Sequence, residues 1–253
     1  MTHGGAAENP RVSPTDGVGA TRATANARGG FAGIRRVELN GYNHTVMSGE
    51  SGIITVFGSS RPRDGDGDYE QARALGRELA ARGFRVCSGG YGGVMEAASR
   101  GAKEAGGGTL AVTAKFFRSN ANAWVDEVCA VASWQERLFE LIRVGHGFVA
   151  CKGGTGTLVE LAVVWEMLNK GMLQGKPFVV LGEFWMPIIE RVREVEMDHD
   201  SRWSEAAERL VYVARTPSDA AEHFVRRLTR ERRTSVSGGF PGGKGPGGPP
   251  GPG

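Results

Sequence analysis

One stretch decides the fold: Gly147-Phe148-Val149-Ala150-Cys151-Lys152-Gly153-Gly154-Thr155-Gly156-Thr157-Leu158-Val159-Glu160. Its first five residues form a short apolar run, as in a strand buried inside a parallel sheet, and apolar side chains recur at helical spacing from Leu158 to Leu168. The first N–H groups of a helix have no partner within it, and glycines let an anion approach the main chain. The stretch predicts a strand, an anion-binding turn and a helix.

A second interpretation of the same residues needs no ligand. Thr157 and Glu160 have the spacing of a capping box, in which Thr157 would begin the helix and Glu160 would accept a hydrogen bond from its N–H group. The glycines would then serve a tight turn only. A single glycine-rich turn does not separate the two interpretations, so further glycine turns become important.

The 253-residue chain, 40% of it hydrophobic, is long enough for one substantial core. Residues 1–48 have no sustained apolar period, and the end of the chain is almost entirely Gly and Pro. We expect a disordered N-terminal arm at 1–48, a single folded domain at 49–233 and a disordered tail at 234–253.

Composition and charge exclude several classes of protein. The formal net charge is only +3, and no basic stripe is interleaved with aromatic residues, so we do not expect a nucleic-acid partner. No apolar run is long enough to span a membrane and no signal peptide follows Met1, which predicts a soluble, cytoplasmic protein. Cys87, Cys129 and Cys151 are predicted to be buried free thiols, and neither they nor the histidines have metal-ligand spacing. We expect no metal and no cofactor.

Strand and helix patterns alternate along the folded part. A helix capped by Asp68 and ended by Gly83 should follow the first strand. This order predicts an α/β fold, a doubly wound, mainly parallel, Rossmann-like sheet with helices on both faces. The predicted strands are 53–57, 84–87, 109–113, 147–151, 177–181 and 210–213.

Three loops of small residues follow predicted strands. Ligands of such sheets bind outside the carboxyl ends of the strands, so these loops should converge on one crevice that binds a phosphate. The expected substrate-binding residues are Ser59, Ser60, Gly89, Gly90, Gly93, Gly153, Gly154, Thr155, Gly156 and Thr157. Neither a dinucleotide fingerprint nor a Walker lysine motif is present, which favours a mononucleotide or a sugar phosphate over NAD or FAD.

Two further features leave alternatives open. Residues 115–131 form an irregular polar segment that is either a substrate lid or a surface excursion with aromatic residues packed into the core. Ser133 and Glu136 form a capping box that begins a helix. On that helix Arg137 flanks the apolar stripe, and its spacing favours a surface arginine whose stem covers apolar neighbours.

Together these residues resemble the LONELY GUY (LOG) family, once labelled lysine decarboxylase-like. The resemblance covers about residues 53–181. Its main motif is matched by Gly153, Gly154, Gly156, Thr157 and Glu160, with Arg137 on the preceding helix. The resemblance implies cleavage of the N-glycosidic bond of a nucleoside 5'-monophosphate, such as AMP or a cytokinin nucleotide, to free base and ribose 5-phosphate. It also implies that Glu160 is the catalytic carboxylate, that Arg137 pairs with it or with substrate, and that the protein is a homodimer.

The chain departs from the family pattern at three positions. Lys152 replaces a proline, Leu138 replaces a lysine and Ser88 replaces a glycine. These departures concern the substrate more than the fold. The alternative function is a non-catalytic nucleotide or molybdenum-cofactor carrier that uses the same crevice.

Overall fold

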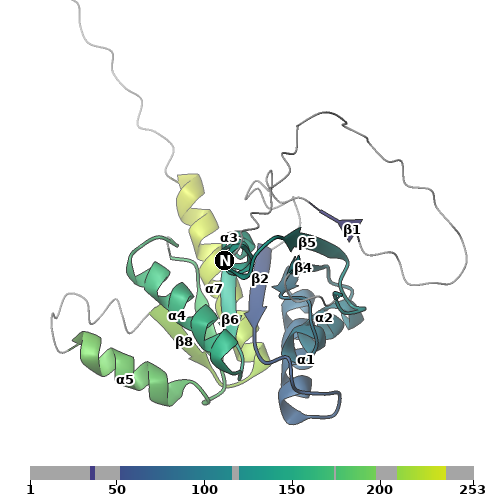
Figure 1. Ribbon diagram of the computed structural model, residues 1–253. Coiled ribbons are helices and arrows are strands. Elements are labelled where there is room, and N and C mark those ends of the chain that lie inside the picture. The colour runs from purple at the N-terminus through teal and green to yellow at the C-terminus, as the bar shows by residue number, and fades with distance from the viewer. Residues whose placement is uncertain (1–34, 38–51, 116–119, 174, 198–209, 238–253) are drawn as a thin grey trace, which may run out of the picture. The chain divides into compact units, whose positions relative to one another are not determined.

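All strands in the described part of the chain run parallel in one sheet (Figure 1). The computed structural model describes residues 35–37, 52–115, 120–173, 175–197 and 210–237. These described residues belong to one compact unit. The strands are β1 (Arg35–Arg36), β2 (Gly52–Phe57), β3 (Phe84–Ser88), β4 (Thr109–Ala114), β5 (Glu127–Val131), β6 (Gly147–Ala150), β7 (Phe178–Leu181) and β8 (Val211–Ala214).

The order of the strands creates a switch point between β2 and β6. The sheet order is β1-β5-β4-β3-β2-β6-β7-β8, so the chain moves outward from β2 in one direction and returns to pair β6 with its other side. Phe57 and Ala150, the last residues of β2 and β6, face each other in register. The two following loops therefore leave the sheet side by side, where doubly wound folds bind their ligands.

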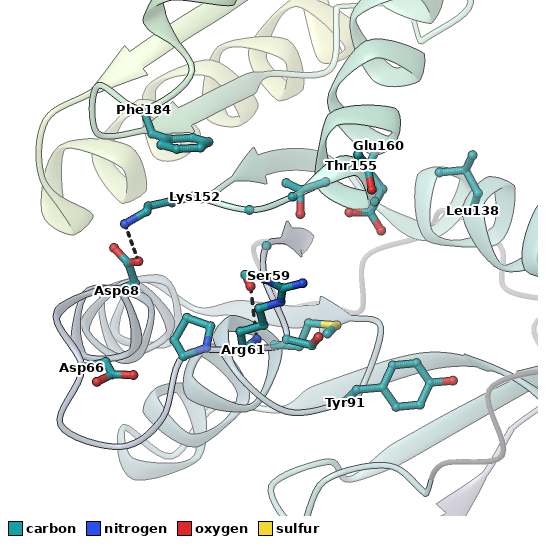
Figure 2. Close-up of a pocket in the computed structure, with 18 of the residues that line it drawn as sticks. Ser59, Arg61, Asp66, Asp68, Tyr91, Leu138, Lys152, Thr155, Glu160 and Phe184 are labelled. Atoms are coloured by element: carbon teal, nitrogen blue, oxygen red, sulfur yellow. Dashed lines mark hydrogen bonds and ion pairs between the residues drawn. The ribbon is translucent and has the colours of Figure 1, made fainter.

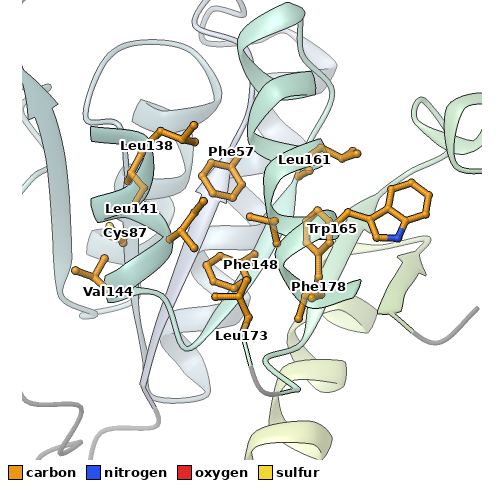
Figure 3. Packing of buried hydrophobic residues seen from close by; sticks show 14 of the residues in the cluster. Phe57, Cys87, Leu138, Leu141, Val144, Phe148, Leu161, Trp165, Leu173 and Phe178 are labelled. Carbon is orange, nitrogen blue, oxygen red and sulfur yellow. The ribbon is translucent and has the colours of Figure 1, made fainter. Parts of the chain in front are cut away.

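Helices cover both faces of the sheet. Alternate side chains of β2 point to opposite faces, so Ile53 and Phe57 join one core cluster while Ile54 and Val56 join the other. One face packs against α3 (Trp134–Val144), α4 (Thr155–Asn169) and α5 (Met186–Met197), and Figure 3 shows this core around Phe57 and Phe148. The other face packs against α1 (Gly67–Ala81), α2 (Val94–Glu104) and α7 (Pro217–Ser237). The predicted doubly wound α/β fold is confirmed.

Two strands were not predicted. β5 lies within the segment expected to be irregular, because its polar first residue and partly exposed end hide the apolar pattern. Asp126 accepts hydrogen bonds from the backbone N–H (2.9 Å) and hydroxyl (3.1 Å) of Thr109, which aligns β5 beside β4. β1 falls inside the predicted disordered arm and pairs with β5, whereas residues 1–34 and 38–48 lie outside the described residues. At the other end, α7 continues four residues into the predicted tail, and residues 238–253 lie outside the described part.

The two predictions for helix starts outside the glycine turn have different outcomes. Ser133 caps α3 and accepts a hydrogen bond from the N–H of Glu136 at 3.1 Å, as predicted. Asp68 does not cap α1. The cap residue is Asp66, and Asp68 lies in the first turn with its carboxylate available for a tertiary contact.

The other sequence predictions concern single groups. Cys87, Cys129 and Cys151 are buried and free, as predicted.

Asn122 donates from its backbone and its side-chain amide to the carbonyl of Gly90, at 2.7 and 3.0 Å, which ties the β4–β5 connection to the β3–α2 turn. Residues 116–119 of that connection lie outside the described residues. No helix in the described part is both long and apolar enough to cross a membrane.

Glycines allow α1 and α2 to pack backbone against backbone. A Cβ atom added at Gly76 would lie 2.0 Å from the carbonyl oxygen of Ala98, and one at Gly101 would lie 1.8 Å from that of Arg73. Both obstacles are main-chain atoms of a neighbouring helix, which cannot move without displacing that helix. The close approach therefore depends on two missing side chains.

We predict that Gly76→Ala and Gly101→Ala each lower the free energy of unfolding by about 1–3 kcal/mol through overpacking. Intrinsic helix propensity alone would favour alanine by about 1 kcal/mol, so the expected sign is opposite. Urea unfolding monitored by circular dichroism measures the change. Gly67→Ala is the control, because a Cβ at Gly67 meets nothing within 4 Å. Stabilisation by either interior substitution would contradict the contact.

Candidate functional site

A cleft of about 940 Å³ opens over the carboxyl ends of β2 and β6 (Figure 2). The loops after β2, β3, β6 and β7, the first turns of α1 and α2, and the helices α3 and α4 supply its walls. The lining residues are Gly58, Ser59, Ser60, Arg61, Pro62, Asp66, Asp68, Tyr91, Met95, Trp134, Arg137, Leu138, Lys152, Gly153, Gly154, Thr155, Gly156, Thr157, Glu160 and Phe184.

The start of α4 presents unpaired N–H groups to the cleft. Gly154 is the N-cap residue, and because glycine has no side chain, no side-chain oxygen accepts from the first N–H groups of the helix. The first helical hydrogen bond runs from the N–H of Leu158 to the carbonyl of Gly154 at 3.0 Å. The N–H groups of residues 155–157 therefore have no acceptor within the helix. The exposed backbone from Gly154 to Gly156 and the helix dipole favour an anion here.

The capping-box interpretation of this turn is wrong. Thr157 is the third residue of α4 and is buried, so it does not begin the helix. Glu160 is consequently not a cap partner. Its carboxylate is oriented toward α3 instead, where Arg137 lies.

Arg137 and Glu160 form a largely buried ion pair. Arg137 Nη1 lies 3.8 Å from Glu160 Oε1, and their side chains are only 8% and 15% exposed. Arg137 Nε donates to the carbonyl of Val112 at 3.0 Å, and the guanidinium lies 5.4 Å from the ring centre of Tyr91. The interpretation of Arg137 as a surface residue is therefore wrong. These contacts fix its orientation.

Burial governs the protonation of Glu160. Removal of its carboxylate from water raises the pKa of Glu160 to about 7, against a smaller lowering effect of the Arg137 charge. A carboxyl group with this pKa exists in both protonation states near neutral pH. Such a group can exchange protons with a reacting molecule, which an ordinary surface glutamate does poorly.

Nine of the twelve predicted site residues line the cleft. Gly89, Gly90 and Gly93 do not, although two of them shape it from behind. A Cβ at Gly89 would lie 1.5 Å from Arg137 Nη2, so this glycine leaves room for the guanidinium. Gly93 has φ +69°, and a Cβ there would lie 2.3 Å from the carbonyl oxygen of Ser59.

The loop after β2 is held in place by its neighbours. The N–H of Ser59 donates to the carbonyl of Lys152 at 3.2 Å, and the carbonyl of Ser59 accepts from the N–H of Val94 at 2.8 Å. Ser59 Oγ accepts from the N–H of Arg61 at 3.1 Å. The Ser59 hydroxyl is thus positioned at the cleft opposite the start of α4, as Figure 2 shows for Ser59 and Thr155.

The sequence did not predict that Lys152, Asp68 and Phe184 meet at one end of the cleft. Lys152 Nζ forms an ion pair with Asp68 Oδ2 at 2.9 Å, and it lies 5.9 Å from the ring centre of Phe184. Only Lys152 carried a signal in the sequence, as a departure from the family motif. Asp68 was predicted as a helix cap, and nothing marked Phe184, because these residues meet only through the folded sheet.

In the part of the chain that the structure describes, no group of three or more His, Cys, Asp and Glu side chains could hold a metal ion. His146 instead accepts a hydrogen bond at Nδ1 from the N–H of Ile53 at 3.1 Å. That contact gives it a structural role at the start of β2.

Comparison with known proteins establishes the family. The sequence profile of the SLOG cluster4 family matches residues 51–208, which is more than half of the chain. The chain belongs to the SLOG cluster4 family. Cytokinin riboside 5'-monophosphate phosphoribohydrolase LOG4 of Arabidopsis thaliana is 34% identical over 140 residues, which are 53% of this chain and 63% of that protein. The cytokinin riboside 5'-monophosphate phosphoribohydrolase of Mycobacterium marinum is 36% identical over 142 residues, which are 54% of this chain and 75% of that protein. The predicted LOG resemblance is confirmed.

Solved structures with the same fold include two proteins that are described as binding or carrying the molybdenum cofactor and not as phosphoribohydrolases. The molybdenum cofactor binding protein of Rippkaea orientalis superposes on this SLOG cluster4 protein with a TM-score of 0.55 and 25% identity, covering 69% of this chain and 96% of that one. The molybdenum cofactor carrier protein of Chlamydomonas reinhardtii gives a TM-score of 0.51 at 25% identity, covering 71% and 98%. The match to the Arabidopsis protein spans less than two thirds of its length.

The raised pKa of Glu160 predicts a pH-dependent stability difference from Glu160→Gln. The ordinary carboxyl pKa is 4.5 and the folded pKa is about 7, so between these values the folded protein binds more protons than the unfolded chain. Stability contributed by this group is therefore lost as the pH rises through that window. Glutamine does not titrate, so the variant should gain stability relative to the parent, by up to about 3 kcal/mol at pH 8.

Urea unfolding at pH 5, 6, 7 and 8 measures the difference. Glu166→Gln, which changes an exposed residue of the same helix, should keep the pH dependence of the parent. A difference for Glu160→Gln that stays constant with pH, or falls as the pH rises, would show that burial does not control this carboxyl group.

Proposed function

We propose that the protein hydrolyses the N-glycosidic bond of a nucleoside 5'-monophosphate to free base and ribose 5-phosphate. The observation that carries this proposal is the placement of the Arg137–Glu160 pair in one cleft with the unpaired N–H groups that begin α4. The first feature offers a carboxylate at the reacting bond, and the second offers a site for the phosphate.

The 5'-phosphate would occupy the start of α4. The N–H groups of residues 155–157 and the hydroxyl of Ser59 approach it from opposite sides of the cleft. Binding of this non-reacting group fixes the ribose and places its C1' atom near the carboxylate. Binding energy is thereby used for orientation at the reacting centre.

Glu160 would act at C1'. As the bond from C1' to the base nitrogen breaks, positive charge develops on the ribose, and a nearby carboxylate stabilises that charge. The oxygen of water bonds to C1' as the bond to the base nitrogen breaks, and the proton that water loses passes to Glu160. The leaving nitrogen takes up one proton from solvent, and Glu160 later returns its proton to solvent, so that one water molecule is consumed in total. Arg137, held by the carbonyl of Val112, would favour the ionised form of Glu160 and fix its position.

The base would occupy the end of the cleft beyond Glu160. Leu138 lines this part with apolar surface and Tyr91 adds an aromatic ring. Met95, whose sulfur lies 3.9 Å from the Arg137 guanidinium, and Trp134, one turn before Leu138 on α3, also line the cleft. Leu138 replaces the lysine of the family pattern, which removes a charge from this wall. The lining supports a cytokinin-type base with an apolar substituent in preference to adenine itself.

The test is release of free base from AMP and from isopentenyladenosine 5'-monophosphate, followed by chromatography. We expect a higher kcat/KM for the isopentenyl nucleotide. Glu160→Gln should lower kcat by at least about 100-fold, and Arg137→Lys should lower it less, because lysine keeps the charge but loses the planar fork.

Glu166→Gln is the matched control, since Glu166 is exposed on the same helix and does not line the cleft. Full turnover by Glu160→Gln would refute the assigned role. Recovery of intact nucleotide that nevertheless raises the melting temperature of the parent would favour a binding or carrier function over hydrolysis.

We also propose a homodimer, as the LOG resemblance implies. Phe139 supports it, because α3 carries Arg137 on its buried side while the Phe139 ring is 54% exposed. Light scattering should give twice the chain mass of 26.9 kDa, and Phe139→Asp should shift the protein toward the single-chain mass. A single-chain mass for the parent at micromolar concentration would contradict a stable dimer.

A further inference from the structure

We propose that the cleft contains a second anionic subsite, which binds a phosphoryl group attached to the 5'-phosphate. The ligands of this subsite are nucleoside 5'-diphosphates and nucleotides linked through a diphosphate. The proposal rests on the placement of the 5'-phosphate at the start of α4 given above. It extends the ligand in the direction away from the base.

The cleft continues on both sides of the phosphate position. In Figure 2, Ser59 and Thr155 lie in the middle, Glu160 and Leu138 lie toward one end, and Lys152, Asp68 and Phe184 lie toward the other. The proposed hydrolysis uses only the end with Glu160. The other end belongs to the same cleft, and a monophosphate nucleotide leaves it unfilled.

Lys152 is placed to serve this unfilled end. It immediately precedes the turn at Gly153, and its Nζ atom reaches Asp68 Oδ2 at 2.9 Å across the cleft. The two side chains are 52% and 36% exposed, and exposed ion pairs contribute little net stability. Lys152 can therefore exchange the carboxylate for a more highly charged phosphoryl group at little cost.

Arg61 supplies a second cation. It lines the cleft and is exposed, and within the described residues its guanidinium takes part in no ion pair or hydrogen bond. Its backbone N–H donates to Ser59 Oγ at 3.1 Å, which holds the main chain of Arg61 beside Ser59 and leaves the exposed side chain free to reach the phosphate site. A guanidinium presents several donors in one plane, which suits the oxygens of a phosphoryl group.

Phe184 bounds the far end. Its ring is 49% exposed and packs edge-on against Trp185, whose Nε1 donates to the carbonyl of Cys151 at 2.9 Å. The end of the cleft thus has two cations near the phosphate and an aromatic wall beyond them. This arrangement suits a diphosphate whose second phosphoryl group ends there or continues into a sugar.

The experiment compares the binding of AMP, ADP and ADP-ribose by calorimetry. The protein is the full chain with Glu160→Gln, so that no ligand is cleaved. We expect ADP to bind at least about tenfold more tightly than AMP. Equal gains for ADP and ADP-ribose would identify the diphosphate linkage as the recognised group, and a gain for ADP alone would identify a terminal phosphate.

Variants at the subsite test its members. Lys152→Met and Arg61→Met should each reduce the ratio of ADP to AMP affinity, whereas Asp68→Asn should increase it by removing the competing carboxylate. Lys170→Met is the control, because Lys170 pairs with Glu166 outside the cleft.

Two results would overturn the proposal, and they differ in meaning. If AMP binds and ADP binds equally or more weakly, the second subsite does not exist, while the 5'-phosphate site stands. If neither nucleotide binds, the placement of the 5'-phosphate fails as well, and the proposed hydrolysis fails with it.

Discussion

The parallel pairing of β2 with β6 is the constraint on which the rest of the structure depends. It places the last residues of both strands, Phe57 and Ala150, side by side. The loop with Ser59 and the turn that begins α4 must therefore face each other. Because β6 is entered from α3 and left through α4, the same strand also brings Arg137 to Glu160. The cleft follows from strand order before any side chain is considered.

The Arg137–Glu160 pair shows a conflict between stability and chemistry. A separation of 3.8 Å is long for an ion pair, and burial penalises the charged carboxylate more than the guanidinium relieves it. A closer pair would lower the pKa of Glu160 and make it a poor proton acceptor. The hydrogen bond from Arg137 to Val112 maintains the separation, because it commits Nε of the guanidinium to β4.

The sequence predicted the sheet well because its strands are buried on both faces and are continuously apolar. β5 was missed because it lies next to the edge of the sheet, where its outer neighbour β1 has only two residues, and a strand in that position does not need the continuous apolar pattern. The helix starts at Asp68 and Thr157 were misplaced by a few residues, since capping patterns are local and several residues near each start satisfy them. Arg137 needed the family resemblance, because its spacing alone favoured the surface. The contact between Lys152 and Asp68 joins residues far apart in sequence, and no local pattern reports it.

The hydrogen bond from Trp185 Nε1 to the carbonyl of Cys151 affects the entropy of ligand binding in the cleft. The indole N–H and the carbonyl are both buried, so detaching the loop after β7 would leave two polar groups without partners. Phe184 belongs to that loop, and the hydrogen bond of its neighbour Trp185 holds the loop to Cys151, the residue after β6. This wall of the cleft is thus preorganised: its conformational entropy is lost during folding, and a ligand that contacts it does not have to order it.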